Sequence, residues 1–272
     1  MRTRSRHVSF AAALLLVAAA PAQQRAPRRT PAAKAGPVPR MADGKPDMQG
    51  FWNAQAIAAA FDIEEHPGTF GVMGGKSIIV DPPDGKIPYQ PWALARKKET
   101  AAHHMYDDPE AHCISSGIPR QTYAPFGLQI LQPPGDVLIL YEAYHVFRII
   151  PTDGRPHVSP HIRVFEGDSR GHWEGGTFVV DVTNQTDRTW FDMAGNFHSD
   201  AIHVVERYTM LDSNTIRYEA KIEDPKVYTR PWTMAFNLAR NWQPGYQLLE
   251  FACPEGERDL QHYTEKEGGK KN

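Results

Sequence analysis

Apolar and polar residues alternate along most of the chain, and turn residues interrupt the pattern at short intervals. Nine segments have strand composition and are bounded by Gly, Pro, Asn or Asp: Ser77–Asp81, Leu128–Leu131, Val137–Ala143, Val146–Pro151, Thr177–Thr183, Ile202–Leu211, Thr215–Glu223, Trp232–Leu238 and Gln247–Cys253. Only Trp92–His104 has helical composition, and residues 105–127 form a long irregular segment. Because no strand–helix–strand rhythm occurs, the pattern predicts an all-β antiparallel barrel or sandwich. We expect a barrel, lipocalin-like or related, with one short helix and long irregular loops.

The segments 202–211 and 215–223 predict a hairpin whose register decides which charged group faces the core. A three-residue turn pairs Tyr208 with Tyr218 and places Glu206 on the core face. The same register sets Arg207 opposite Glu219 on the outer face, which is a favourable cross-strand pair. Burial of apolar side chains favours this arrangement.

A two-residue turn would reverse the faces and would bury His203 and Arg207 instead. Either register leaves an ionisable group on the core face, so a site inside the barrel is expected in both cases. Desolvation favours the protonated form of a buried carboxyl group, which suits general acid–base catalysis. Glu206 and the loop histidine His198 are therefore the first catalytic candidates, and His203 and Arg207 are the candidates of the other register. A structural ion pair is the alternative role for Glu206, and loop packing is the alternative for His198.

Further polar and aromatic residues are candidates for contacts with a small molecule. Glu142 and Arg148 lie in an apolar hairpin, Val137–Ile150, whose two hydrophobic faces predict a central strand pair covered on both sides. We expect Glu142 to pair with Arg148 or His145, and ligand anchoring by Arg148 is the second interpretation. Asp168 lies in a Gly-rich stretch without a phosphate-binding pattern, but its side chain could point into a cavity. The candidate aromatic contacts are Trp190, Tyr208, Tyr218 and Trp232.

The first 22 residues predict a cleavable secretory signal. Arg2, Arg4 and Arg6 precede the apolar run Val8–Ala20, and small residues follow at the expected cleavage positions. An uncleaved anchor is the alternative, although the run is short for a bilayer. Loss of the three leader arginines lowers the formal net charge from −2 to −5, which argues against a nucleic-acid partner. No second apolar run of membrane length follows, so we expect a periplasmic or secreted protein without a membrane span.

The chain has 2 cysteines, and both follow the predicted signal. In an oxidising compartment an even pair is most simply one disulfide, so we expect a Cys113–Cys253 bond. The chain has 12 histidines, and the densest cluster is His103-His104 with His112-Cys113. Its spacing matches no common metal motif. We therefore expect neither a metal nor a cofactor, although the sequence does not decide whether segment 103–112 binds a metal.

The composition predicts four regions along the chain. Residues 1–22 form the signal, and residues 23–42, rich in Pro, Ala and basic groups, form a disordered linker. Residues 43–264 form one β-barrel-like domain, and residues 265–272 form a flexible tail. The sequence does not indicate an oligomeric state.

Several segments together resemble a family of uncharacterised exported β-rich proteins of soil and aquatic bacteria. The segments that carry the resemblance are residues 43–52 (DGKPDMQGFW), Cys113 with Gly117 and Pro119-Arg120, residues 153–155, residues 167–181 (GDSRGHWEGGTFVVD), His198-Ser199, Glu206-Arg207-Tyr208, residues 223–225 and Pro231-Trp232. Ser115 stands where the family pattern has Pro, and Gly176 where it has Asp. The resemblance implies export and one β-rich domain, but it implies no activity.

These observations lead to two main functional hypotheses. The first is a cofactor-free acid–base enzyme, a lyase or a hydrolase, that acts on a small aromatic or hydrophobic compound. The second is a non-catalytic barrel that binds the same class of small molecule. A third, an assembly factor of the cell envelope, would require a large exposed apolar patch. Ionisable groups that converge on a cavity would favour the first hypothesis.

Overall fold

A computed structural model describes residues 34–69, 71–103, 107–251 and 253 of the 272-residue chain. The predicted signal, most of the predicted linker and the predicted tail lie outside these residues. The elements in chain order are β1 Gly50–Ala54, η1 Ile57–Ala60, β2 Ile79–Asp81, α1 Pro91–His103, η3 Pro109–His112, α2 Arg120–Tyr123, β3 Gly127–Leu131, β4 Asp136–Tyr141, η4 Ala143–His145, β5 Phe147–Pro151, β6 Asp168–Glu174, β7 Thr177–Thr183, β8 His203–Asp212, β9 Thr215–Glu223 and β10 Trp232–Arg240.

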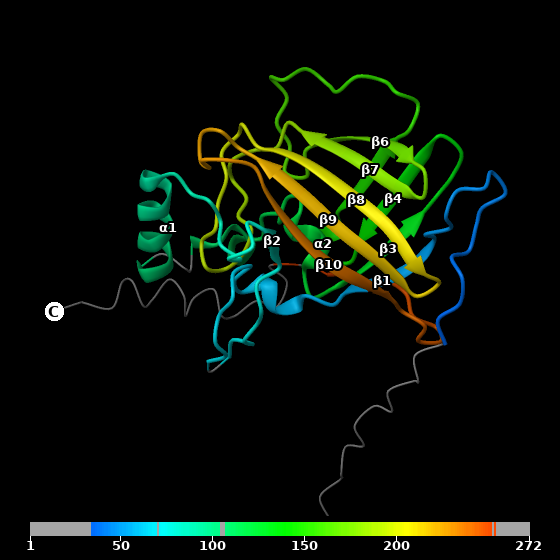
Figure 1. The fold of residues 1–272 in the computed structure, drawn as a ribbon, viewed down its shortest axis with the longest axis horizontal. Helices are drawn as coiled ribbons and strands as arrows, with labels where there is room; N and C mark the ends of the chain where they lie inside the picture. The colour runs from blue at the N-terminus through cyan, green and yellow to red at the C-terminus, as the bar shows by residue number, and fades with distance from the viewer. Residues whose placement is uncertain (1–33, 70, 104–106, 252, 254–272) are drawn as a thin grey trace, which may run out of the picture. The chain divides into compact units, whose positions relative to one another are not determined.

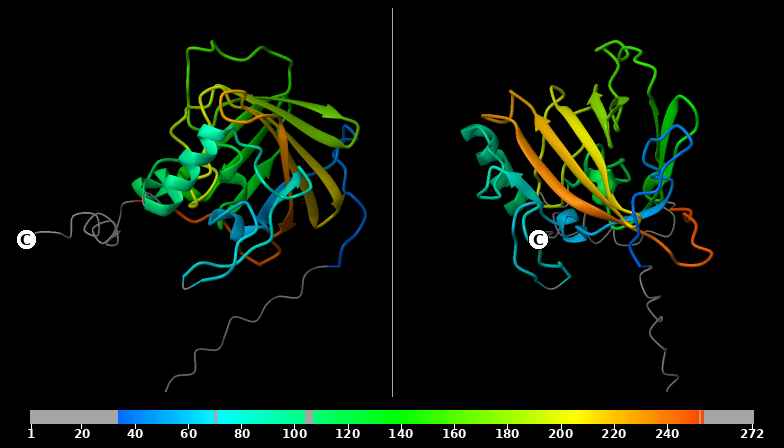
Figure 2. Two further views of the ribbon diagram at one scale, coloured as in Figure 1. Left: turned by 60° about the vertical axis from the view of Figure 1, so that its left-hand side comes forward. Right: turned by 45° about the vertical axis from the view of Figure 1, so that its right-hand side comes forward.

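The strands form a nearly closed antiparallel barrel, as the sequence pattern predicts. Nine of them follow the order β5-β4-β3-β1-β10-β9-β8-β7-β6, and β2 pairs separately with β10. Figure 1 shows the long strands β8, β9 and β10 crossing side by side, and Figure 2 shows the sheet curling round toward β4 and β5. The order has two ends, β5 and β6, so the barrel has a seam without a backbone ladder.

The register of the β8–β9 hairpin is the one that places Glu206 inside the barrel. Tyr208 pairs with Tyr218 and Glu206 with Ala220, and the exposed fraction of Glu206 is 0%. The expected three-residue turn is wrong in detail. Asp212 pairs with Thr215, so the loop has two residues, and the register shift between Met210 and Asp212 compensates for the shorter loop.

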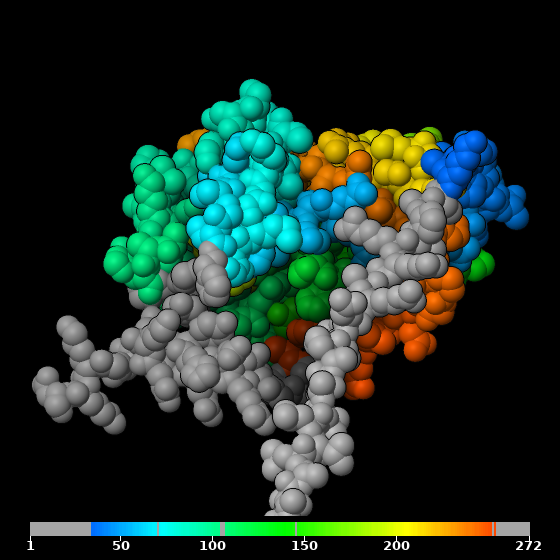
Figure 3. Space-filling model, turned by 90° about the horizontal axis from the view of Figure 1, so that it is seen from below, coloured from blue at the N-terminus to red at the C-terminus, as the bar shows by residue number. Residues whose placement is uncertain are grey.

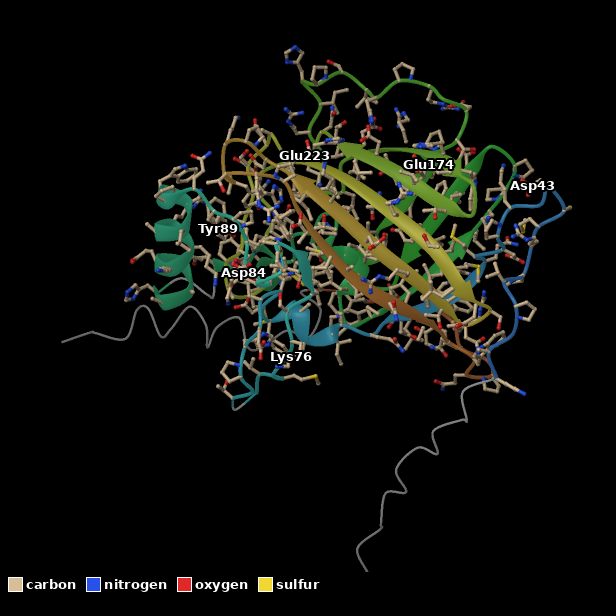
Figure 4. The ribbon with its side chains drawn as sticks, viewed as in Figure 1. Asp43, Lys76, Asp84, Tyr89, Glu174 and Glu223 are labelled. Atoms are coloured by element: carbon tan, nitrogen blue, oxygen red, sulfur yellow. A yellow bond between two sulfur atoms is a disulfide. The ribbon has the colours of Figure 1, made fainter. Side chains whose placement is uncertain are left out.

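Arg207 faces outward, as this register requires, but its ion-pair partner differs from the expected one. Its Nη2 lies 2.9 Å from Oε2 of Glu174, a residue at the β6–β7 turn. Glu174 is labelled in Figure 4. Glu219 is the cross-strand neighbour of Arg207 in the backbone register, yet its carboxylate lies 3.9 Å from Nε of Arg217.

Large side chains fill the barrel, and the short helix α2 contributes to this core. All four residues of α2 are buried. The fully buried side chains include Trp52, Tyr123, Phe178, Tyr208, Tyr218 and Trp232. Tyr123 packs edge-on against Phe236 of β10, with ring centroids 5.7 Å apart. Outside the barrel, residues 55–69 and 71–90 lie next to α1 when the molecule is seen from below (Figure 3).

The expectation that residues 137–150 form a central, doubly covered strand pair is wrong. β5 is an end strand, and its outward residues Phe147 and Ile149 are 65% and 54% exposed. The buried residues of this strand are Arg148 and Ile150, whose side chains point inward, and Pro151 at its end. A run of apolar residues does not distinguish an interior strand from an end strand whose outer face stays uncovered.

Three local predictions differ from the structure. β1 and β6 were not expected as strands, because Gly50 and the Gly-rich stretch around β6 indicate turns. Residues 247–251 were expected to begin a strand but have no strand structure. The helix expected over 92–104 is confirmed as α1, and the described part of the expected irregular segment, from residue 107 on, contains two short helices.

The barrel's contacts begin before Asp43, so the expected linker ends too late. The backbone N–H of Gly36 donates to Oγ of Ser213 at 2.8 Å, and the carbonyl oxygen of Gly36 accepts from the N–H of Ser213 at 3.0 Å. Val38 packs against the core. Hydrogen bonding to the β8–β9 turn therefore fixes this part despite its linker-like composition. Among the described residues, no helix is long and apolar enough to cross a membrane.

The expected disulfide is present between Cys113 and Cys253, whose Cα atoms lie 5.6 Å apart over a sequence separation of 140. Closing a loop of this length lowers the entropy of the unfolded chain, and the chain-entropy model assigns the bond about 5 kcal/mol at most. We predict that the variant Cys113→Ser/Cys253→Ser unfolds at a lower urea concentration than the oxidised protein. Urea titrations of the oxidised protein, the reduced protein and the variant measure this effect. Equal midpoints for all three would contradict it.

Candidate functional site

A buried ion pair between Arg148 of β5 and Glu206 of β8 lies inside the barrel. The Arg148 guanidinium donates to both carboxylate oxygens, with distances of 3.2 Å from Nη1 to Oε1 and 2.5 Å from Nη2 to Oε2. Both residues lie on inward positions of their strands. Burial acts to lower the pKa of Arg148, but the attraction of Glu206 and neighbouring groups outweighs it and raises that pKa well above its usual range.

Tyrosine hydroxyl groups complete the hydrogen bonds of this pair. Tyr208 and Tyr218 each donate to Oε1 of Glu206 at 2.9 Å. Burial, and then the negative charge of Glu206, raises the pKa of both tyrosines well above the usual value. They therefore stay protonated and remain donors at ordinary pH. The hydroxyl oxygen of Tyr141 lies 3.4 Å from Nη1 of Arg148 and extends the network.

Arg148 also bridges the seam between the two end strands. Its Nη2 lies 2.8 Å and its Nε 3.3 Å from Oγ of Ser169 on β6. Next to this bridge, Gly171 allows a close approach of the strands, because a Cβ atom there would lie 2.9 Å from Ile150 of β5 and 2.6 Å from Phe178. Side-chain hydrogen bonds and close packing thus join β5 to β6 where the backbone ladder ends.

A second carboxyl group, Glu166, lies just before β6 on the same side of the barrel. Its Oε1 accepts from the hydroxyl group of Ser115 and, at 3.4 Å, from the N–H of Gly117. Its Oε2 is buried and has no partner among the described residues. Burial is the largest influence on Glu166 and raises the pKa of its carboxyl group, although Ser115 and Arg148 oppose the shift.

Gln185 lies beside Glu166 and also has an unpartnered polar atom. Its Oε1 accepts from the N–H of Ile118 at 2.9 Å, so Glu166 and Gln185 bind consecutive backbone amides. The Nε2 atom of Gln185 is buried without a partner among the described residues. Gly117 holds this turn with φ +72°, and a Cβ atom there would lie 2.7 Å from Oγ1 of Thr189 and 3.1 Å from Oε1 of Gln185. Glycine is therefore required here on two grounds.

A cavity of about 340 Å³ lies at the seam, between β5 and the segment that leads into β6. Phe147, Ile149, Val164 and Phe165 supply apolar walls, whereas Ser115, Arg148, Glu166, Asp168 and Ser169 supply polar ones. Arg148 already donates to Glu206, Ser169 and Tyr141. Among the polar groups, Glu166 therefore retains the most unused capacity for hydrogen bonding.

Asp168 and His203 belong to a polar cluster on the outer face of the barrel. His157 joins Oδ2 of Asp168 at 2.7 Å to Oδ2 of Asp181 at 2.9 Å through its two ring nitrogens. His203 contacts the other oxygen of Asp181. Burial acts to raise the pKa of Asp181, but the two histidines reverse this effect, so the pKa is lowered. Asp168 is the predicted candidate that both joins this cluster and lines the seam cavity.

The remaining sequence candidates lie apart from the Glu206 cluster. Burial lowers the pKa of His198. Its Nδ1 faces the Ser199 carbonyl oxygen at 3.0 Å, and its Nε2 faces the Thr189 hydroxyl oxygen at 2.8 Å. Glu142 accepts from the hydroxyl group of Tyr246 at 3.1 Å. Its expected pairing with Arg148 is wrong, because Arg148 pairs with Glu206, and the other expected partner, the side chain of His145, lies outside the described residues.

The two candidate tryptophans have packing positions. Trp232 is fully buried, and its ring packs edge-on against Phe191 with centroids 5.5 Å apart. Trp190 is partly buried against the core, and its backbone forms a bridge with Phe197. Four candidates are therefore brought together inside the barrel: Arg148, Glu206, Tyr208 and Tyr218.

Sequence reasoning missed Glu166, Gln185, Ser115, Tyr141 and Ser169. Tyr141 had a usable signal, because the alternation that buries Val137 and Ile139 also turns Tyr141 inward. Glu166 and Gln185 lie outside strands, where periodicity does not indicate direction. In the part of the chain that the structure describes, no group of three or more His, Cys, Asp or Glu side chains could hold a metal ion.

Comparisons with known proteins do not add to this picture. No protein-family model, curated protein or solved structure matches the chain. The geometry of the seam and the chemistry of its residues are therefore the basis for any functional conclusion.

Proposed function

We propose that the protein is an exported barrel that binds a small aromatic or hydrophobic molecule in the seam cavity. The observation that carries this proposal is Oε2 of Glu166, a buried polar atom without a partner among the described residues, on a side chain that lines the cavity. A buried polar atom without a hydrogen bond is unfavourable by about 1–3 kcal/mol, so such atoms in native proteins usually mark a place for water or a ligand. The export part of the proposal is supported by the basic and apolar leader of the sequence.

This atom defines the head group that would fit. An ionised Glu166 accepts a hydrogen bond, so the ligand must offer a donor. The N–H group of a primary carboxamide is such a donor. Phe147, Phe165 and Ile149 then suit an aromatic body, and the cavity volume of about 340 Å³ is at the small end of the range for ligand pockets.

Acid–base catalysis at the same cavity is the second candidate function. Burial raises the pKa of Glu166 toward the range in which a carboxyl group exchanges protons efficiently, and Ser115 is in hydrogen-bond contact with it. Glu206 is less suited to this role in the described conformation. It has no exposed surface, and both its oxygens are bound by Arg148 or by tyrosine hydroxyl groups. A lyase or hydrolase reaction would therefore proceed at Glu166.

The first prediction for this site uses benzamide as the probe. In the variant Glu166→Gln, Ser115 and Gly117 bind the amide oxygen, so the amide nitrogen takes the place of Oε2 and faces the donor of the ligand. We expect benzamide to bind the wild type and to bind this variant about 10–100-fold more weakly, the range for one charged hydrogen bond. Isothermal titration calorimetry gives both affinities.

Toluene and the variant Glu174→Gln serve as controls. Toluene has no head group, so its affinity should be the same for the wild type and Glu166→Gln. Glu174 is an exposed glutamate at the β6–β7 turn, and its replacement should not alter benzamide binding. If benzamide binds Glu166→Gln as tightly as the wild type, this site assignment is wrong. Consumption of an aromatic amide or ester by the wild type, followed by NMR, would favour the enzyme over the binding protein.

A pH dependence follows from the raised pKa of Glu166. The folded protein holds this proton more tightly than the unfolded chain does. The stabilisation is therefore fully present below the unfolded pKa and is lost as the pH rises through the folded pKa. We expect the free energy of unfolding to decrease with increasing pH in this window and Glu166→Gln to reduce the slope. Urea titrations over a pH series measure it, and an unchanged slope in the variant would contradict the prediction.

The role of Glu206 is separable from that of Glu166 by stability measurements. Glu206→Gln leaves the Arg148 charge buried without its counter-charge, which should lower the free energy of unfolding by about 3–5 kcal/mol. The double variant Arg148→Met/Glu206→Leu removes both charges and should be more stable than Glu206→Gln. Benzamide affinity per folded molecule should change little in Glu206→Gln. If Glu206→Gln is as stable as the wild type but loses a measured turnover completely, Glu206 is instead a catalytic residue.

A further inference from the structure

A second hollow, of about 450 Å³, lies on the outer face of the barrel. Its floor is the outward side of β9 and β10, and residues 55–59, Met73 and residues 75–78 form its walls. The last of these segments leads into β2, which pairs with β10, and Figure 1 shows β2 beside β10. In the order of the sheet, β1, β3 and β4 lie between β10 and β5. The hollow is therefore a different site from the seam cavity.

Two polar side chains from neighbouring strands form the floor. Asn237 of β10 and Arg217 of β9 are direct cross-strand partners, and both line the hollow. The Oδ1 atom of Asn237 is buried and has no hydrogen-bond partner among the described residues. The described contact of Arg217 is a loose one, with 3.9 Å between its Nε and Oε1 of Glu219. The terminal nitrogens of this guanidinium are consequently available to a stronger acceptor.

The walls are apolar at the base and carry one cation at the rim. Ala56, Ala58 and Ile78 supply the apolar surface. Lys76 lies on the loop at the lower edge in Figure 4 and forms an exposed ion pair with Glu65 at 2.5 Å. The charged groups at this hollow are thus Arg217 and Lys76, with Glu219 and Glu65 as their respective partners. Among the described residues, Glu219 at 3.9 Å is the competitor for a carboxylate that reaches Arg217.

We propose that this hollow is a binding site for a short aliphatic hydroxycarboxylate. The carboxylate accepts from the terminal nitrogens of Arg217, whose planar donor arrangement matches a carboxylate. The hydroxyl group donates to Oδ1 of Asn237 and satisfies the one buried acceptor on the floor. The short carbon chain lies against Ala56, Ala58 and Ile78. A neutral amide of the same shape lacks the charge that Arg217 selects.

The test uses 3-hydroxybutyrate, butyrate and butyramide as probes, with binding followed by NMR chemical-shift titration of the full-length exported protein. We expect 3-hydroxybutyrate to bind more tightly than butyrate, and butyramide to bind at least tenfold more weakly than either. Arg217→Gln should weaken both carboxylates by about tenfold or more. Asn237→Ala should abolish the preference for 3-hydroxybutyrate over butyrate while the affinity for butyrate changes little.

Arg207→Gln is the matched control, because it removes an outward arginine of β8 that does not line the hollow. Its affinities should equal those of the wild type. Melting temperatures of all variants show whether each is folded, and Arg217→Lys gives a second test that keeps the charge but loses the planar donor pair. Absence of binding to the folded wild type overturns the proposal, as do affinities unchanged in Arg217→Gln. A retained hydroxyl preference in Asn237→Ala overturns the assignment of Asn237.

Discussion

The ion pair between Arg148 and Glu206 is the interaction on which the barrel interior depends. It joins β5 to β8, and through Ser169 it also joins β5 to β6, the two strands that no backbone ladder connects. Two buried charges are unfavourable unless each is fully hydrogen-bonded. The hydroxyl groups of Tyr208 and Tyr218 meet this requirement on the Glu206 side.

The open seam also explains why the candidate site lies where it does. Beside it, the chain that enters β6 has no strand partner on its β5 side, and space remains for a cavity between Val164–Ser169 and β5. Backbone turns at 115–118 orient Glu166 and Gln185 through single N–H groups. Each side chain thereby uses one polar atom for the fold and keeps the other unused. This division of roles separates Glu166 from Glu206, which uses both oxygens inside the core.

The outer hollow at Arg217 and Asn237 also contains a polar side chain with an unused hydrogen-bonding atom, but it lies outside the barrel. A covering segment packs over the outward face of β9 and β10 and removes polar side chains from solvent without supplying partners for all of them. Two of the buried polar atoms without a described partner, Oε2 of Glu166 and Oδ1 of Asn237, thus lie at imperfectly closed boundaries of the structure. One boundary is the barrel seam, and the other is the contact between the sheet and its cover.

Sequence patterns were enough to predict the β-rich fold, the inward direction of Glu206, Tyr208 and Tyr218, and the pairing of Cys113 with Cys253. Strand periodicity of two assigns each residue of a regular hairpin to a face, and burial then selects the register, so local patterns were sufficient there. The partner of Glu206 could not be predicted in this way, because Arg148 is 58 residues away in sequence and comes near Glu206 through the folding of the whole barrel. Only the tertiary structure placed Glu166 beside Gln185 and Arg217 beneath a covering segment. The local pattern of one segment does not indicate which distant segment it will contact. Strand order and the course of irregular connections depend on the packing of the whole chain.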